Sequence, residues 1–239
     1  MPLQKKLQTM NDNKINDLLN NLYNGCATLL GSLLNDDEQQ YDRIIFMGSH
    51  GTGKSTLAKE LSDIIGIPVV ESVAREVTKD INYLKDKKVI TNPDSDAYQT
   101  VLCSVSRWDF MRWVDSRFPV IMTRCPLDTI AYAMADDDVS EGTVKMNMSI
   151  LQDDEGFNAA IKNSLFIYIP IEFGIEDDGI RPTDIQFQKD VDECMRRLMH
   201  TFHITPLVVT GTVEERLEAI LVKLVGADMA KVLLDGAYE

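Results

Sequence analysis

The chain has 239 residues, of which 44% are hydrophobic, and carries a formal net charge of −14 at pH 7. This length suits one large domain, or one domain with an added segment. The acidic balance argues against a protein that grips duplex DNA over a broad basic surface. It favours a small substrate, or nucleic acid held only by a local basic pocket.

The sequence also predicts the cell compartment. No run of about 18 apolar residues is present, so we expect no membrane span. The lysines near the N-terminus lack the apolar stretch of a secretory signal. The four cysteines are scattered and form neither a CxxC pair nor a zinc-binding spacing: Cys26, Cys103, Cys125 and Cys194. This pattern is typical of buried, reduced thiols in a cytoplasmic protein.

The first segment reads as a helix followed by a linker. Apolar residues of 13–34 fall on one helical stripe that runs from Ile15 to Leu33. Such an amphipathic helix packs on the domain or on a second copy of the chain, which would make a homodimer. Residues 35–40, "NDDEQQ", read as a linker. We therefore expect an N-terminal extension over 1–40 and one domain over 41–239.

From residue 41 onward the pattern becomes that of an α/β domain. Five short apolar runs are typical of strands buried on both faces of a parallel sheet: 43–47, 67–71, 119–123, 165–171 and 206–211. Helical stretches separate them: 54–66, 72–84, 95–117, one from Pro126, 184–202, and 212–226 with a last short helix after it. This alternation predicts a five-stranded, doubly wound parallel sheet with helices on both faces.

The stretch "GSHGTGKST" (48–56) joins the first predicted strand to the first helix and fits GxxxxGK[ST] without a mismatch. Glycines let the backbone curl so that its N–H groups face a phosphate, and the helix N-terminus adds positive potential. The predicted phosphate-binding residues are Gly48, Ser49, His50, Gly51, Thr52, Gly53, Lys54, Ser55 and Thr56. Lys54 should reach the terminal phosphates of ATP or GTP, and the Ser55 hydroxyl should bind Mg²⁺. His50 occupies a free position of the motif, which favours a neutral, solvent-facing side chain.

Two further predicted strands end in charged residues, and such ends face the ligand crevice of an α/β sheet. Glu71 ends the second strand, where its carboxylate can take or align the proton of an attacking hydroxyl. A helix-capping role with an ion pair to Arg75 is the alternative. Arg124 follows the third strand and is a candidate phosphate clamp. Asp128 begins the next helix, where a plain helix-dipole role also fits.

A mobile lid is predicted around 172–186, because "IEDDGIRPTD" follows the fourth strand and is rich in turn-forming residues. Arg181, between Gly179 and Pro182, is the lid's candidate phosphate-binding arginine; an ordinary surface loop is the alternative. Lys54, Glu71, Arg124 and Arg181 together make the predicted catalytic set of a kinase. The chain has no NKxD motif of a switch GTPase. A ring-type motor is expected to add a second acidic strand-end motif and an arginine finger.

Taken together, "GSHGTGKSTLAKEL", "PVVESVAREV", "TRCPLDTIAYA", "EDDGIRPTDIQFQKDVDECM" and "VTGTVEERLEAI" resemble a group of P-loop kinase domains over about residues 43–222. The group includes the nicotinamide-riboside kinase domain of bacterial NAD regulators and many phage proteins, and looks related to thymidylate and deoxynucleoside kinases. The resemblance implies a substrate-side carboxylate at Glu71 and phosphate-side arginines at 124 and 181. Members usually carry an acid before the strand-end arginine, where this chain has Thr123. Glu71 or Asp128 would replace it, or Mg²⁺ would be held through water.

One phage branch of this group resembles kinases that phosphorylate 5-hydroxymethyluracil within DNA. The leading substrate prediction is therefore 5-hydroxymethyl-deoxyuridine in phage DNA, in host cytoplasm, with a free nucleoside or nucleotide as the alternative. Arginines and tryptophans that interleave over 107–117 could clamp a single strand, although a half-buried helix with an exposed basic edge is the favoured explanation. The competing class is a nucleotide-binding switch or assembly protein, suggested by Thr123 and the helix over 13–34.

Overall fold

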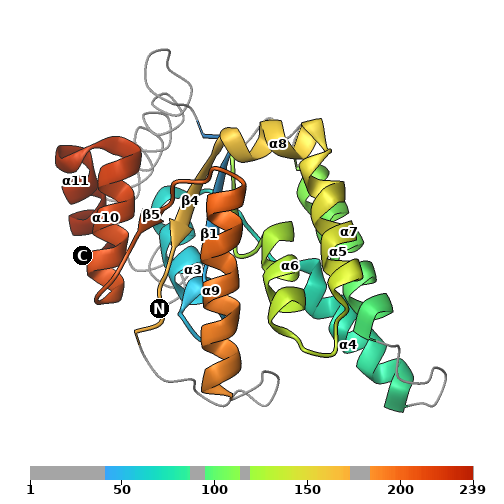
Figure 1. Ribbon diagram of the computed structural model, residues 1–239. Coiled ribbons are helices and arrows are strands. Elements are labelled where there is room, and N and C mark those ends of the chain that lie inside the picture. The colour runs from blue at the N-terminus through green and yellow to red at the C-terminus, as the bar shows by residue number, and fades with distance from the viewer. Residues whose placement is uncertain (1–40, 87–94, 114–118, 173–183, 239) are drawn as a thin grey trace.

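The computed structural model describes residues 41–86, 95–113, 119–172 and 184–238 (Figure 1). The predictions for the helix over 13–34, the linker, Cys26 and Arg181 concern residues outside these ranges. Within the described residues, no helix is both long and apolar enough to cross a membrane.

Five parallel strands form one sheet in the order β2-β3-β1-β4-β5. The strands are β1 (Arg43–Met47), β2 (Val69–Val70), β3 (Val120–Met122), β4 (Ser164–Tyr168) and β5 (Leu207–Val208). β1 lies at the centre, paired along its whole length with β4. The predicted five-stranded sheet is confirmed, although four of its strands are shorter than the apolar runs from which they were predicted.

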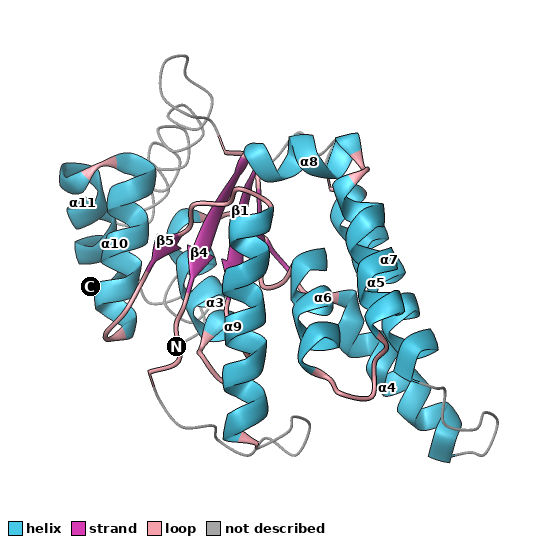
Figure 2. Cartoon of the chain, viewed as in Figure 1, coloured by secondary structure: helices cyan, strands magenta, loops and turns pink. Residues whose placement is uncertain are grey.

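Both faces of the sheet are covered by helices (Figure 2), and β1 shows why. Its side chains alternate, so that Ile45 and Met47 enter one core while Ile44 and Phe46 enter the other. The first core is closed by α5 (Ser95–Met111), α6 (Pro126–Ala135), α7 (Glu141–Gln152), α8 (Glu155–Lys162) and α9 (Ile185–Thr201). The second is closed by α3 (Lys54–Ile65), α10 (Val213–Val225) and α11 (Ala227–Tyr238). Because helices cover both faces of the sheet, a central strand such as β1 must be apolar on both of its faces.

The helices begin and end at residues suited to those places. α3 (Lys54–Ile65) ends at Gly66, which adopts the left-handed conformation with φ 73°. α6 (Pro126–Ala135) and α10 (Val213–Val225) begin with capping boxes, and Asp184 caps α9 (Ile185–Thr201). The remaining predicted helices are α4 (Val73–Asp86), α5 (Ser95–Met111) and α11 (Ala227–Tyr238).

Two helices were not predicted: α7 (Glu141–Gln152) and α8 (Glu155–Lys162). Their N-caps, Ser140 and Asp154, each accept a hydrogen bond from a backbone N–H of the first turn. Asp154 also pairs with Arg107 of α5, which ties the start of α8 to that helix. Cys103, Cys125 and Cys194 are free and buried, as predicted, and burial raises the pKa of each thiol.

Gly48 is a residue at which a side chain would clash with the backbone of another strand-end segment. Its φ is +143°, and a Cβ there would lie 2.5 Å from the carbonyl oxygen of Ile169. We predict that Gly48→Ala lowers the free energy of unfolding by about 1–3 kcal/mol, because it adds a backbone clash to an unfavourable φ. Urea unfolding of the full chain measures this.

Gly142→Ala is the matched control, since Gly142 lies in the first turn of α7 and its nearest neighbour to an added Cβ is Ser140 Oγ at 3.7 Å. Its free energy of unfolding should stay unchanged or rise by up to about 1 kcal/mol. Equal effects of the two substitutions would contradict the assignment of strain to residue 48.

Candidate functional site: a phosphate loop between two groups of buried charges

The predicted phosphate loop lies where the motif requires, between the end of β1 and the start of α3. Gly48, Gly51 and Gly53 all have positive φ. Lys54 is 6% exposed, and its Nζ donates to the carbonyl oxygens of Gly48 at 2.7 Å and Ser49 at 2.5 Å. The ammonium group therefore lies folded back against the loop, close to where terminal phosphates are expected.

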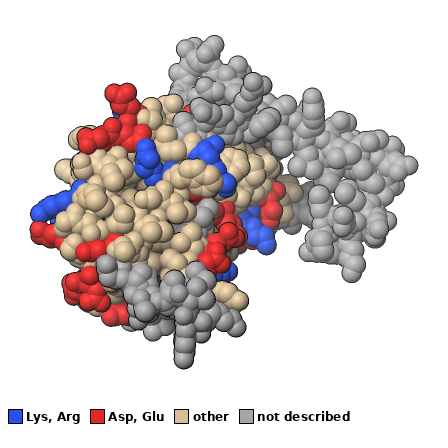
Figure 3. All heavy atoms as spheres, turned by 90° about the vertical axis from the view of Figure 1, so that its right-hand side faces the viewer, with Lys and Arg blue, Asp and Glu red and all other residues tan. Residues whose placement is uncertain are grey.

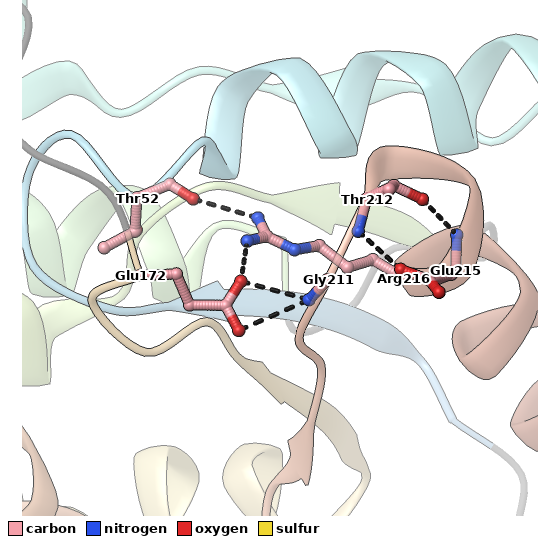
Figure 4. Close-up of polar contacts among 6 residues, drawn as sticks. All are labelled: Thr52, Glu172, Gly211, Thr212, Glu215 and Arg216. Atoms are coloured by element: carbon pink, nitrogen blue, oxygen red, sulfur yellow. Dashed lines mark hydrogen bonds and ion pairs between the residues drawn. The ribbon is translucent and has the colours of Figure 1, made fainter.

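Two more carbonyl groups of the loop are held from outside it. Gln188 Nε2 of α9 donates to His50 O at 2.7 Å. Arg216 of α10 donates from Nη1 to Thr52 O at 3.2 Å (Figure 4). Because a peptide unit is planar, with N–H and C=O pointing in opposite directions, a held carbonyl also fixes the direction of the next N–H. These contacts shape the loop for an anion.

The prediction that His50 faces solvent is wrong. Its side chain is 1% exposed, and Nδ1 shares a hydrogen bond of 3.1 Å with the hydroxyl of Tyr132 in α6. Its ring also lies 6.1 Å from that of Phe187 in α9. The motif leaves this position free, but α6 and α9 cover this side of the loop, so the imidazole packs between them.

Arg124 follows β3, as predicted, and is half-buried. Its guanidinium lies 5.1 Å from the centre of the Tyr132 ring, a cation–π distance. Burial alone would lower the pKa of Arg124, but the neighbouring Tyr132 and Asp128 raise it above its ordinary value. The guanidinium is therefore a permanent positive charge on the same side of the loop as His50.

Asp128, given only an optional role by the sequence, is the buried acid of this site. It is 1% exposed, and its Oδ2 accepts a hydrogen bond of 2.8 Å from the backbone N–H of Cys125. Among the described residues, its Oδ1 has no hydrogen-bond partner. Burial raises the pKa of Asp128, while the charges of Arg124 and Lys54 lower it, and the net direction is upward. A buried carboxylate with an open oxygen, within electrostatic reach of Lys54, is a functional-site signal.

Glu71 follows the last residue of β2 and is exposed. It lines an open hollow together with Glu76 of α4 and with Arg112 and Trp113, which follow α5. Arg112 lies 5.2 Å from the Trp108 ring and 5.4 Å from the Trp113 ring, and pairs with Asp109. Glu71 thus stands at a strand end beside a hollow that holds an arginine and an aromatic ring. The side chain of Arg75, its suggested ion-pair partner, is outside the described residues.

The predicted lid, 172–186, coincides largely with undescribed residues, and Arg181 is among them. Glu172, at its start, is described and accepts from Arg216 Nη2 at 2.6 Å. The sequence analysis did not single out Arg216 as a site residue, although it lies within the quoted stretch "VTGTVEERLEAI". Its one available signal was its place in the helix after the last strand.

Thr123, where the resemblance led us to expect an acid, is buried and directly follows β3. Ser55, the predicted Mg²⁺ ligand, is exposed in the first turn of α3. In the described parts of the chain, no three His, Cys, Asp or Glu side chains cluster to hold a metal.

A phosphate loop between a central parallel strand and a helix, with helices on both faces of the sheet, defines a P-loop fold of the kinase type. The structure is similar to that of a NadR protein in complex with NAD and AMP-PNP, with 19% sequence identity and a TM-score of 0.56 over 78% of this chain and 50% of that chain. It is also similar to deoxyadenosine kinase from M. mycoides with bound dATP, at 15% identity and a TM-score of 0.51, over 76% and 98% of the two chains.

Residues 43–216 match the family model described as an AAA domain, and the chain belongs to that family. No protein of curated function matches the sequence. The chain spans half the length of the NadR protein it resembles.

The buried carboxyl group gives a stability prediction with a definite sign. Because the folded state raises the pKa of Asp128, its charged form costs stability at pH values above the folded-state pKa, and this cost is lost as pH falls toward 3.8. Asp128→Asn keeps an oxygen that accepts from Cys125 but removes the charge. We expect its free energy of unfolding to equal or exceed that of the wild type near neutral pH, and the difference to shrink close to pH 3.8.

Urea unfolding at the two pH values measures this difference. Asp128→Ala, which removes the cap as well as the charge, should be less stable than Asp128→Asn by about 1 kcal/mol. A clear loss of stability in Asp128→Asn at neutral pH would show that the charge stabilises the fold instead.

Proposed function

We propose that the protein is a kinase that transfers the terminal phosphoryl group of ATP or GTP to a nucleoside-like acceptor. The observation that supports this most strongly is the open oxygen of Asp128 within the electrostatic field of Lys54 and Arg124, beside a complete phosphate loop. Phosphoryl transfer needs charged groups around the transferred phosphate, and a buried acid influenced by Lys54 and Arg124 suits that need.

The proposed step is an in-line displacement. The acceptor hydroxyl oxygen forms a bond to the γ-phosphorus, the bond to the β,γ-bridging oxygen breaks, and the nucleoside diphosphate leaves. Glu71, exposed at the hollow beyond β2, takes the hydroxyl proton. Lys54, Arg124 and Arg181 stabilise the charge on the transferred group.

Asp128 takes the role of the acid missing at Thr123. With Ser55 it would hold Mg²⁺, directly or through water, and the bound cation would neutralise phosphate charge. The alternative role of Asp128 is to orient the guanidinium of Arg124, which lies in the segment between β3 and α6. Both roles require the negative charge and the open Oδ1.

A free nucleoside or nucleotide is the acceptor that the geometry favours, through a hydroxyl or a phosphate. A DNA strand needs free cations, yet Arg107 pairs with Asp154 and Arg112 with Asp109. Figure 3 shows the face formed by α4, α5, α7 and α8, where the visible Lys and Arg side chains are interspersed with Asp and Glu and form no continuous basic patch. These ion pairs argue against the clamp suggested by the sequence.

One observation, the exposure of Trp108, still supports a DNA acceptor. Trp108 is 60% exposed and carries Arg112 on its ring, an arrangement suited to stacking a base. 5-Hydroxymethyl-deoxyuridine in DNA therefore stays as the second candidate acceptor. A homodimer through residues 13–34 and a cytoplasmic location also remain predictions.

We predict that Glu71→Gln lowers the rate of phosphoryl transfer by about 10²-fold or more, since it removes a proton acceptor, while nucleotide affinity persists. The assay uses labelled ATP and GTP with a panel of free nucleosides, nucleotides and hydroxymethyluracil-containing DNA. Glu76→Gln is the matched control, because Glu76 lines the same hollow one turn into α4 and should keep nearly full rate.

Three results would count against this assignment. If no acceptor of the panel is labelled, the acceptor class is wrong. If Glu71→Gln binds nucleotide and changes no measurable property, the switch or assembly function gains support. Labelling of DNA alone would select the second candidate acceptor over the first.

Asp128→Asn should lower the transfer rate by about 10²-fold or more with every acceptor, because charge stabilisation near the transferred group is lost. Together with its unchanged or increased stability, this separates a catalytic acid from a structural one. Raising the Mg²⁺ concentration should partly restore the rate if the carboxylate helps to hold the cation, and should have no effect if it orients Arg124. A rate equal to that of the wild type would remove Asp128 from the site.

A further inference from the structure

Arg216 is a buried charge that the proposed chemistry does not use. It is 5% exposed, and its guanidinium is held between a backbone carbonyl and a carboxylate (Figure 4). Taking a guanidinium out of water is costly unless its partners are well placed. An arginine needed only for the stability of α10 could lie on the exposed side of that helix. The burial of Arg216 is therefore explained by the other segments that it contacts.

Those segments come from two distant parts of the chain. Arg216 Nη1 donates to Thr52 O of the phosphate loop, 164 residues away in sequence. Nη2 donates to Glu172 Oε2, in the segment that directly follows β4. Both carboxylate oxygens of Glu172 in turn accept from the backbone N–H of Gly211, at 3.3 and 3.0 Å.

The carboxylate side of this arrangement is itself fixed. Thr212 and Glu215 form a capping box, in which Thr212 N–H donates to Glu215 Oε2 at 2.8 Å and Thr212 Oγ1 accepts from Glu215 N–H. This box anchors the backbone from which the Gly211 N–H points at Glu172. The hydrogen bond from Arg216 lowers the pKa of Glu172, so the pair is charged at neutral pH.

The carbonyl side bears directly on phosphate binding. The Thr52 carbonyl and the Gly53 N–H belong to one planar peptide unit and point in opposite directions. Gly53 has φ 90°, and a Cβ placed there would lie 3.6 Å from Arg216 Nη1. A guanidinium that holds the carbonyl on one side keeps the N–H turned to the other. Without that hold, a glycine peptide is free to rotate.

We infer that Arg216 is a positioning residue for the phosphate loop: oriented by Glu172, it holds the Thr52–Gly53 peptide so that the Gly53 N–H is presented to the phosphate chain of the bound nucleotide. This inference rests on the proposed function only in requiring that the loop bind a triphosphate. It makes no use of the acceptor.

The test is triphosphate affinity by isothermal titration calorimetry on the full chain, with inorganic tripolyphosphate and Mg²⁺ as the probe and ATP as a second ligand. Tripolyphosphate has no base or sugar, so it reports on the loop alone. We expect Arg216→Met to weaken its binding about tenfold or more, because a charged hydrogen bond that orders the loop is lost. Arg216→Lys should recover part of the affinity.

Arg196→Met is the matched control. Arg196 in α9 also pairs with a carboxylate, that of Asp192, and lies on the Tyr168 ring. Neither of these partners belongs to the phosphate loop. Its substitution removes an equally ion-paired arginine, and should leave the affinity for tripolyphosphate unchanged.

Glu172→Gln keeps an oxygen for the Gly211 N–H and removes the charge that orients Arg216, so it should weaken binding in the same direction by a smaller factor. This variant carries the test if Arg216→Met does not fold. Equal affinities of wild type, Arg216→Met and Glu172→Gln would overturn the inference and leave the proposed kinase standing. A wild-type chain that binds neither tripolyphosphate nor ATP would overturn the proposed function as well.

Discussion

Lys54 places a full positive charge at the edge of the protein interior, and the organisation of the site follows from that charge. Its hydrogen bonds to the carbonyls of Gly48 and Ser49 offset part of the cost of removing an ammonium group from water. Those carbonyls can face the ammonium only because the loop turns through a glycine with φ +143°. A triphosphate supplies far stronger compensation than two carbonyl dipoles do. Lys54 therefore makes the loop a site that is stabilised by binding its ligand.

The pKa of Asp128 likewise depends on a balance between the cost of burial and the effect of nearby charges. Asp128 is buried at the start of α6, where the capping box with Cys125 fixes its side chain. The backbone N–H satisfies one oxygen, and the charges of Arg124 and Lys54 oppose the pKa increase that burial causes. Two cations around one buried carboxylate leave this region with a positive balance. Such a balance suits a polyphosphate better than it suits a neutral ligand.

The sequence was sufficient for the parts of the molecule that are set locally. β1, the loop and α3 follow from a continuous apolar run, a spaced glycine motif and an amphipathic helix that stops at Gly66, and all three lie at the expected residues. The helices α7 and α8 escaped notice because their caps, Ser140 and Asp154, lie within polar, acidic segments that resemble loops. The C-terminal ends of β2 to β5 were predicted too late in the sequence, because each apolar run continues beyond the last residue that pairs with a neighbouring strand.

The supports of the loop, in contrast, could not be read from the sequence. Gln188 and Arg216 reach carbonyls that are 138 and 164 residues away, and neither belongs to a motif with a fixed spacing. The same holds for His50, whose burial depends on α6 and α9 closing over it rather than on any property of the loop. A motif specifies which backbone shape is attainable, and the distant helices decide how firmly that shape is held.

These supports also divide the loop into two sides. On one side, α6 and α9 hold His50 through Tyr132 and Gln188, and Arg124 lies on the same tyrosine. On the other side, α10 holds Thr52 through Arg216 and Glu172. His50 and Thr52 are separated by a single residue, Gly51, whose positive φ gives the intervening peptides rotational freedom. The carbonyls on either side of Gly51 are thus held by different helices, so the shape of the loop depends on how α9 and α10 pack against it.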